Sequence, residues 1–176
     1  MLPLQTKFTR KATVCLLFFI PICAESKAVG MVIYMDYHLE RFLQAQEHSY
    51  NAALQEIKNG CKQTHWMWYI FPQLKELGRS STAQYYGIKD LEEAKQYLAH
   101  PVLGVRLKEI SEALLTLNTD NPYSVMGSID ALKLCSSMTL FAEIEGYDSV
   151  FGKVIFKFYS GKRDIKTIEI LYSNHN

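Results

Sequence analysis

The sequence predicts an all-α protein: a single compact domain of about six to eight helices, with an N-terminal extension that is signal-like or disordered. Three observations support this prediction. Apolar residues recur at three- and four-residue spacing along residues 36–172, which is the pattern of amphipathic helices. Residues that favour helix starts and helix ends flank these segments. The 176 residues suit one domain with a proper core, and they contain no internal repeat or low-complexity linker.

The first helix is expected to begin after Asp36, whose carboxylate can cap it. Its apolar positions run from Leu39 to Ile57, and Gly60 ends it. An aromatic tract follows, His65-Trp66-Met67-Trp68-Tyr69-Ile70-Phe71-Pro72-Gln73-Leu74, which contains both tryptophans of the chain. Because aromatic side chains bury large areas, the tract marks either the centre of the core or the wall of a pocket.

Shorter elements follow the tract. Residues 73–78 are predicted to form a helical turn that ends at a glycine. Ser80 or Ser81 can cap a short helical segment that runs through Tyr86, and Asp90 can cap a helix over residues 91–99.

The second half of the domain is expected to hold its longest helices. Pro101 suits the first turn of a helix whose buried stripe runs from Val102 to Leu117. Asn121-Pro122 marks a turn. Ser128 or Asp130 begins the next helix. The apolar positions of that helix are Leu132, Cys135, Met138, Leu140 and Phe141.

The segment 147–159 is ambiguous. Val154-Ile155-Phe156 has the composition of a strand, but the spacing of the apolar residues favours a helix that ends at Gly161. Asp164 caps a last helix to about residue 172, and residues 173–176 form a tail.

Composition excludes several classes of function. The formal net charge is +1, and four cations against Glu25 give residues 1–35 a local charge of +3, which leaves −2 for the rest. That balance predicts no nucleic-acid groove. The four cysteines (Cys15, Cys23, Cys61 and Cys135) show no C-x-x-C spacing, so no metal site is predicted, and no cofactor is expected either.

The N-terminal extension, residues 1–35, has two interpretations. Basic residues precede the uncharged run 12–24, as in a secretory signal, and the protein would then be exported. Alternatively, translation starts at Met31 or Met35 and the protein is cytoplasmic. Thirteen uncharged residues are too few to span a bilayer, so no stable membrane anchor is expected.

Two constellations near the tract are candidates for chemistry. His65, beside two tryptophans, could act as a general acid or base, although a histidine that bonds to a backbone carbonyl is the more common case. Gly78-Arg79-Ser80-Ser81 could bind an anion ahead of a helix, or simply end one helix and cap the next.

A third constellation lies on one predicted helix. Asp130 and Lys133 are three residues apart, so they share a face and can pair. Ser136 and Ser137 are unusual inside a helix and favour close packing against a bulky neighbour, for which the tryptophan pair is the obvious candidate. A Ser-Lys nucleophile is the alternative. No H-E-x-x-H, G-x-S-x-G or G-x-G-x-x-G motif occurs.

Four segments together resemble one family: His-Trp-Met-Trp-Tyr-Ile-Phe-Pro-Gln (65–73), Leu-Gly-Arg-Ser (77–80), Tyr-Leu-Ala-His-Pro-Val-Leu-Gly-Val-Arg-Leu (97–107) and Lys-Leu-Cys-Ser-Ser-Met-Thr-Leu-Phe (133–141). This is the bacterial domain-of-unknown-function 1810 family, an all-helical group often labelled calpastatin in genomes. The resemblance implies an all-helical, cytoplasmic protein and implies no activity. The calpastatin label does not suit a compact aromatic-rich domain, because inhibitors of that name are long disordered chains. A weaker similarity points to NADAR-type N-glycosidases.

Two hypotheses of function follow. The first is a small-ligand-binding or interaction module, whose pocket or patch is lined by Trp66, Trp68 and Tyr85. The second is an enzyme acting on a nucleotide-like or ADP-ribosyl substrate, in which Arg79 holds an anionic group and His65 or Asp130 handles the proton. The predicted ligand is a small anionic or nucleotide-like molecule, and the sequence does not predict an oligomeric state. The residues predicted to bind it are Trp66, Trp68, Gln73, Arg79, Ser80, Tyr85, Lys133, Ser136 and Ser137.

Overall fold

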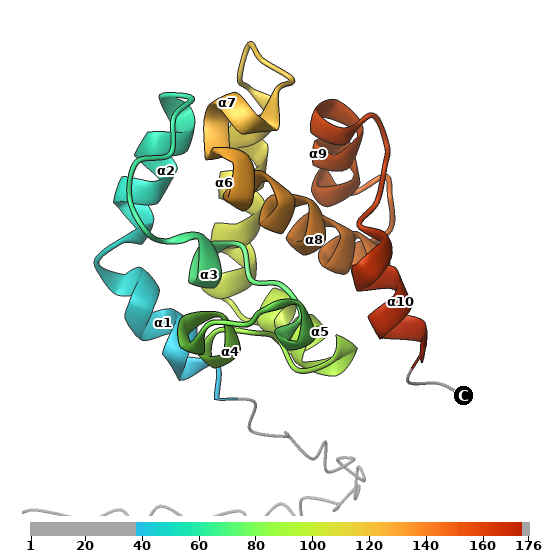
Figure 1. Ribbon diagram of the computed structural model, residues 1–176. Coiled ribbons are helices and arrows are strands. Elements are labelled where there is room, and N and C mark those ends of the chain that lie inside the picture. Colours follow the sequence, from blue (N-terminus) through green and yellow to red (C-terminus); the bar gives the residue numbers. More distant parts are fainter. Residues whose placement is uncertain (1–37, 174–176) are drawn as a thin grey trace, which may run out of the picture. The chain divides into compact units, whose positions relative to one another are not determined.

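The computed structural model describes residues 38–173, which fold entirely into helices and the loops between them (Figure 1). The α-helices are α1 (Glu40–Glu47), α2 (Tyr50–Lys58), α3 (Met67–Ile70), α4 (Ser81–Tyr85), α5 (Leu91–Ala99), α6 (Leu103–Leu115), α7 (Pro122–Met126), α8 (Ser128–Glu145), α9 (Val150–Tyr159) and α10 (Ile165–Ser173). One 3₁₀ helix, η1, spans Lys75–Leu77. The predicted all-α class is therefore confirmed.

Two long helices organise the packing. Helix α6 contacts α2, α5 and α9, and helix α8 contacts α5, α7, α9 and α10 (Figure 1). Their shared neighbours α5 and α9 join the two groups into one core. A parallel bridge between Leu74 and Ile88 ties the end of the aromatic tract to the segment before α5.

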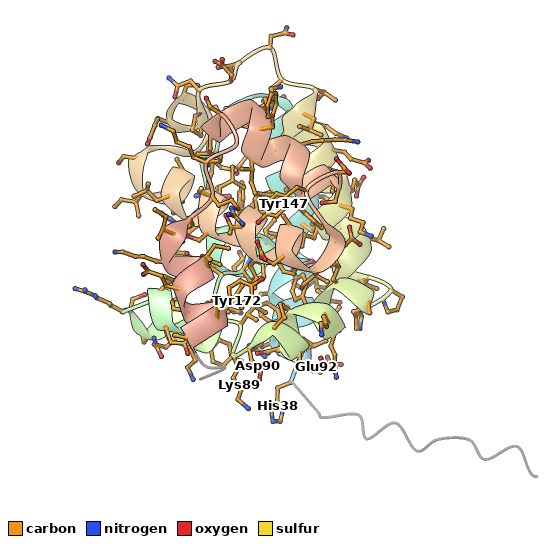
Figure 2. The ribbon with its side chains drawn as sticks, turned by 90° about the vertical axis from the view of Figure 1, so that its right-hand side faces the viewer. His38, Lys89, Asp90, Glu92, Tyr147 and Tyr172 are labelled. Atoms are coloured by element: carbon orange, nitrogen blue, oxygen red, sulfur yellow. The ribbon has the colours of Figure 1, made fainter. Side chains whose placement is uncertain are left out.

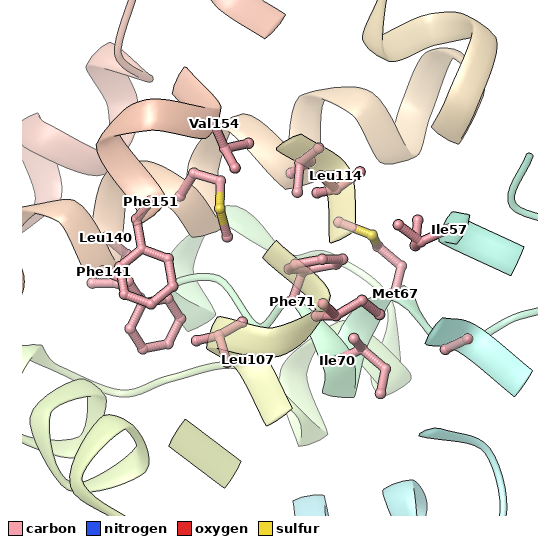
Figure 3. Packing of buried hydrophobic residues seen from close by; sticks show 14 of the residues in the cluster. Ile57, Met67, Ile70, Phe71, Leu107, Leu114, Leu140, Phe141, Phe151 and Val154 are labelled. Atoms are coloured by element: carbon pink, nitrogen blue, oxygen red, sulfur yellow. The ribbon is translucent and has the colours of Figure 1, made fainter. Parts of the chain in front are cut away.

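The core contains most of the aromatic tract. Trp66, Met67, Ile70 and Phe71 are all buried. Figure 3 shows Met67, Ile70 and Phe71 beside Leu107 and Leu114 of α6, and Phe141 beside Phe151 of α9. These side chains account for the strong aromatic signal of the sequence, because large buried rings dominate core energetics.

The single first helix predicted over residues 39–57 is wrong, because the structure has two helices there. The hydroxyl of Ser49 donates to the carbonyl of Ala45 at 2.6 Å, which is the acceptor that the Ser49 amide would use in a continuous helix. The amide of Ser49 bonds instead to the carbonyl of Gln46 at 3.3 Å. The chain therefore turns between α1 and α2.

Helix α7 is a second difference, because only a turn was predicted at Asn121-Pro122. Pro122 occupies the first position of α7, and the Asn121 side chain accepts a hydrogen bond from the amide of Tyr123 at 3.0 Å. The turn signals were in fact a helix start. The two parts of the first helix, α3 and α7 bring the described part of the chain to ten α-helices, above the six to eight predicted.

Several predicted helix starts are confirmed. Asp90 caps α5 by accepting a hydrogen bond from the amide of Glu93 at 2.8 Å, and Ser80 caps α4. The segment 147–159, ambiguous in sequence, forms helix α9. The start of α6 lies so close to α5 that a Cβ at Gly104 would come within 1.8 Å of the Leu98 carbonyl oxygen. Asp36 and the signal-like run 12–24 lie outside the described residues.

Two apolar positions of the predicted helices are exposed, one of which, Val102, was predicted to be buried. Val102 is 37% exposed and Leu132 is 61% exposed. Helix α8 carries apolar or small residues on nearly every face, so its periodicity does not identify one outer side. The exposure of Leu132 becomes important below, because it lies on the wall of a cleft.

No helix within residues 38–173 is both long enough and apolar enough to cross a membrane.

Candidate functional site

The aromatic tract is fixed by one carboxylate that the sequence did not single out. Glu56, in the last turn of α2, accepts hydrogen bonds from the indole Nε1 of Trp66 at 2.8 Å and from the Thr64 hydroxyl at 2.6 Å. It also accepts from the backbone amides of Gln63 and Thr64 at 2.7 and 3.1 Å. Burial alone would raise the pKa of Glu56, but these four hydrogen bonds outweigh it and lower the pKa to about 2. One carboxylate thus holds both the indole of Trp66 and the loop residues that precede the tract.

The structure separates His65 and the Gly-Arg-Ser-Ser turn from the other candidates. His65 is exposed, and its backbone carbonyl accepts a hydrogen bond from the Tyr69 hydroxyl at 3.4 Å. Arg79 is exposed, and the Ser80 hydroxyl accepts from the amide of Ala83 at 3.2 Å as the cap of α4. The cap interpretation of this turn is the one that the geometry supports.

Asp130 lies at the centre of a charge cluster. Its carboxylate oxygens are 2.8 Å from the Nζ of Lys62 and 2.8 Å from the Nζ of Lys133. The two ammonium groups also lie over the tryptophan rings, Lys62 at 5.0 Å from the Trp66 ring centre and Lys133 at 4.8 Å from that of Trp68. The cluster therefore connects the aromatic tract to the start of α8.

The two lysines keep Asp130 ionised. Burial of the carboxyl would raise the pKa of Asp130, but the hydrogen bonds and positive charges of Lys133 and Lys62 outweigh it and lower the pKa. A carboxylate held ionised in this way is a weak candidate for a general base, because its two oxygens are already shared between two ammonium groups.

The two serines of α8 differ in their hydrogen bonds. The Ser136 hydroxyl donates to the Asp164 carboxylate at 2.7 Å. Thr167 also donates to Asp164 at 2.7 Å, and the hydroxyl of Thr139 accepts from the Asp164 amide at 3.0 Å. These bonds dock the start of α10 on α8. Ser137 is fully buried, and its hydroxyl has no hydrogen-bond partner among residues 38–173.

Part of the predicted site meets at a cleft over the exposed side of α8, which we call the α8 cleft. It has a volume of about 730 Å³, and three predicted residues, Gln73, Lys133 and Ser136, line it. Asp130 and Trp68 join this group through Lys133. Cavities of 300–1,000 Å³ are the usual size for small-molecule sites.

The α8 cleft is rich in positive charge. Its walls carry Lys133, Lys162, Arg163 and Lys166 against the single carboxylate of Asp164. Lys133 is paired with Asp130, and Arg163 lies 3.4 Å from Glu143. The side chains of Lys162 and Lys166 have no ion pair within the described residues. Two ammonium groups are therefore available to an anion that enters the cleft.

The basic wall is held in place from both ends of α10. Asp164 fixes its start, as described above. Near its other end, the Tyr172 hydroxyl donates to Glu143 at 2.6 Å, and the Tyr147 hydroxyl donates to the same carboxylate. Figure 2 shows Tyr147 and Tyr172 on the same face of the molecule. The lysines of this wall therefore project from an anchored segment.

A second cleft, lined by residues of α1, α4 and the start of α5, holds Tyr85 and has a volume of about 780 Å³. We call it the α1 cleft. It is slightly larger, but its walls mix both signs of charge: Arg41 pairs with the buried carboxylate of Glu93 at 2.7 Å. Two of its other residues, His38 and Lys89, lie together at one end of the molecule (Figure 2). Its charge does not favour an anion as the α8 cleft does.

No group of three or more His, Cys, Asp or Glu side chains within residues 38–173 is arranged to hold a metal ion.

Comparison with known proteins agrees with the fold. The family described as "Protein of unknown function (DUF1810)" matches residues 36–171. The chain belongs to this family. The DUF1810 domain is also similar to the crystal structure of the conserved hypothetical protein Rv1873 from Mycobacterium tuberculosis. The two share 41% identity with a TM-score of 0.75, over 77% of this chain and 96% of that one.

No curated protein matches the chain. The resemblance to the domain-of-unknown-function 1810 family is therefore confirmed, whereas neither match supports the weaker similarity to NADAR-type N-glycosidases. The calpastatin label has no support in these matches either.

Sequence analysis missed several residues of the α8 cleft in this DUF1810 domain. None of the three cations Lys162, Arg163 and Lys166 was a candidate. Tyr123 and Ile129 also line the cleft and were not candidates. The available signal was the basic pair after Gly161, but only the fold shows that this pair faces α8.

Proposed function

We propose that this DUF1810 domain is a binding module that takes a small anionic ligand in the α8 cleft. The observation that carries the proposal is the pair Lys162 and Lys166, two ammonium groups without an ion pair in the described part of the chain, on the wall of a concave site. Anions gain most from such donors, because charge-assisted hydrogen bonds are about twice as strong as neutral ones.

The neighbouring groups fit the same ligand. Lys133 adds a third cation, held by Asp130 at 2.8 Å, and Gln73 adds an amide that can donate or accept. The one carboxylate of the cleft, Asp164, already accepts hydrogen bonds from two hydroxyls, those of Ser136 and Thr167. The Asp164 carboxylate is therefore bonded to side chains of α8 and α10.

The enzymatic alternative has no such support. It required His65, Gln73, Arg79, Asp130 and Lys133 to meet in one pocket, but His65 and Arg79 line neither the α8 cleft nor the α1 cleft. Asp130 is shared between two lysines. A binding role without catalysis is the function that these positions favour. The cytoplasmic location implied by the family resemblance stays a prediction.

The experiment is a binding titration with matched charge variants. Wild type is titrated with inorganic phosphate and a nucleoside monophosphate by calorimetry, alongside a thermal-shift assay. At 100 times Kd a ligand stabilises the fold by about 2.7 kcal/mol, so the melting temperature should rise measurably. In the double variant Lys162→Ala/Lys166→Ala, the affinity should fall at least about tenfold, as expected for the loss of two charge-assisted hydrogen bonds.

The α1 cleft supplies the control. Lys75→Ala/Lys89→Ala removes the same charge from that cleft, and it should leave the affinity within about twofold because screening limits the effect of distant surface charges. The proposal is wrong if no anion binds wild type, or if the two double variants lose affinity equally.

A further inference from the structure

The two walls of the α8 cleft differ in chemistry, and this difference restricts the kind of anion that fits. The α9–α10 segment supplies Lys162 and Lys166. The α7–α8 segment supplies Tyr123, Ile129 and Leu132. Lys133 of α8 also lines the cleft, but it is paired with Asp130, and Phe158 of α9 lines it but is buried. A ligand that fills the cleft therefore meets the ammonium groups of Lys162 and Lys166 as well as the exposed apolar side chains of the α7–α8 segment.

The apolar wall is formed by exposed residues on two neighbouring helices. Ile129 and Leu132 are three residues apart on α8, so they share one face of that helix. Tyr123 lies on α7, which packs against α8. The three side chains are 54% to 70% exposed, a large apolar surface for residues of this size on a single wall. Grouped exposed apolar residues of this kind mark binding surfaces.

The cleft is also too large for a simple inorganic ion. Its volume of about 730 Å³ lies within the range of 300–1,000 Å³ in which drug-sized ligands bind. An inorganic phosphate on Lys162 and Lys166 would leave the wall of Ile129 and Leu132 in contact with water. Burial of that wall contributes free energy only if the ligand has an apolar part.

We propose that the ligand of the α8 cleft is a soluble amphipathic organic anion, a phosphate monoester or carboxylate that carries an apolar body. The anionic head binds Lys162 and Lys166, with Lys133 and Gln73 beside it, and the apolar body lies on Tyr123, Ile129 and Leu132. This inference rests on the anion-binding function proposed above and names the class of ligand.

The test is a chain-length series. Affinities are measured by calorimetry for inorganic phosphate, ethyl phosphate, butyl phosphate and hexyl phosphate, with 1-hexanol as the uncharged comparison. Burial of a methylene contributes enough for an increase in affinity of about two- to fourfold per added methylene. Hexanol should not bind detectably, because it lacks the charge that engages the lysines.

Variants of the apolar wall distinguish the contribution of the ligand's apolar body to affinity from that of its anionic head. In Ile129→Gln/Leu132→Gln, hexyl phosphate should lose its advantage over ethyl phosphate, while the affinity for ethyl phosphate stays within about twofold. Both positions are exposed, so the fold should tolerate the changes, and circular dichroism checks this. Phe156→Gln is the matched control: Phe156 is 76% exposed on α9 and does not line the cleft, so the chain-length dependence should persist.

Failure of this inference is distinct from failure of the proposed function. Equal affinities for ethyl and hexyl phosphate would overturn the amphipathic ligand and leave anion binding intact. Absence of binding for the whole series, inorganic phosphate included, would overturn both. Association with vesicles of anionic phospholipid, without affinity for the soluble alkyl phosphates, would also overturn the inference, because the ligand would then be a membrane surface.

Discussion

The aromatic tract and the α8 cleft meet at Lys133, which lines the cleft and lies over the Trp68 ring, but the polar groups of the two regions are used in opposite ways. In the tract, Trp66 is fully buried and its indole N–H bonds to Glu56, whose oxygens accept four hydrogen bonds in all. In the cleft, Lys162 and Lys166 are exposed and have no ion pair within the described residues. The polar groups around Trp66 are therefore bonded within the fold, whereas the ammonium groups of Lys162 and Lys166 remain available to a ligand.

This difference shows why a conspicuous sequence feature need not be a binding site. Tryptophan-rich segments stand out because large rings are rare and bury large areas, and that property serves a core as well as a pocket. The lysines of the cleft are individually ordinary surface residues. Their placement in one cleft with exposed apolar side chains, and not their identity, makes them candidates for function.

The largest expected contrast is in stability. Trp66→Ala should lower the free energy of unfolding by about 3–5 kcal/mol, because it empties a fully buried site and removes a donor from Glu56. Leu132→Ala, on the wall of the cleft, should change it by less than about 0.5 kcal/mol. Urea unfolding of both variants measures this contrast, and losses of similar size would remove the distinction between the two regions.

A smaller effect concerns the carboxylate that holds the tract. Glu56→Gln should lower the free energy of unfolding by about 1–3 kcal/mol at pH 7, since the hydrogen bonds to an ionised acceptor are lost. The Leu132→Ala variant again provides the comparison, measured by the same urea unfolding. A loss below about 0.5 kcal/mol would mean that the Glu56 network does not hold the tract.

The acid dependence of stability tests the same carboxylate by another route. The folded pKa of Glu56 is about 2, below its usual value of 4.5, so its contribution is fully present above pH 4.5 and is lost as the pH falls toward 2. Unfolding measured between pH 6 and pH 2 should therefore show a steeper loss of stability in wild type than in Glu56→Gln. Parallel curves would contradict the lowered pKa of Glu56.

Cysteine reactivity compares the cleft with the loop before the tract. Cys61 is exposed, whereas burial and the nearby Asp164 carboxylate raise the pKa of Cys135, which lines the α8 cleft, to about 11. At pH 8 a thiol reagent should modify Cys61 well before Cys135, because the thiolate is the reactive form. A cleft ligand should slow only the Cys135 reaction further; equal protection of Cys61 would argue against binding in the cleft.

The smallest expected effect is at Ser137. Its hydroxyl is buried without a hydrogen-bond partner in the described residues, so Ser137→Ala should be neutral or stabilise the fold by up to about 1 kcal/mol. Ser136→Ala is the matched comparison: it removes the bond to Asp164 and should destabilise the fold by about 1–2 kcal/mol. Equal losses for the two serines, measured by urea unfolding, would contradict this assignment.

Local signals predicted much of the fold. The caps Asp90 and Ser80 could be predicted because each depends on an amide only three positions away. The break at Ser49 was missed, since a serine inside a helical pattern can either point to solvent or take the carbonyl of Ala45. Asn121-Pro122 predicts a turn and not helix α7, because a proline after an asparagine can start either.

The candidate site was harder to predict because tertiary packing creates it. Helix α8 is apolar or small on nearly all sides, so its sequence could not show that Ile129 and Leu132 face outward. The pairing of Asp130 with Lys133 was predicted from their spacing, but the second lysine, Lys62, comes from a distant loop. Likewise, the bonds that hold Asp164, at the start of α10, to Ser136 and Thr139 of α8 join residues that are far apart in the sequence.

The most direct measurement is an amide chemical-shift titration of the ¹⁵N-labelled chain with hexyl phosphate. Binding in the α8 cleft predicts shifts at Tyr123, at Leu132 and over residues 162–166, with residues 65–70 of the aromatic tract unchanged. Shifts centred on residues 65–70, with the cleft silent, would contradict the assignment of the binding site to α8.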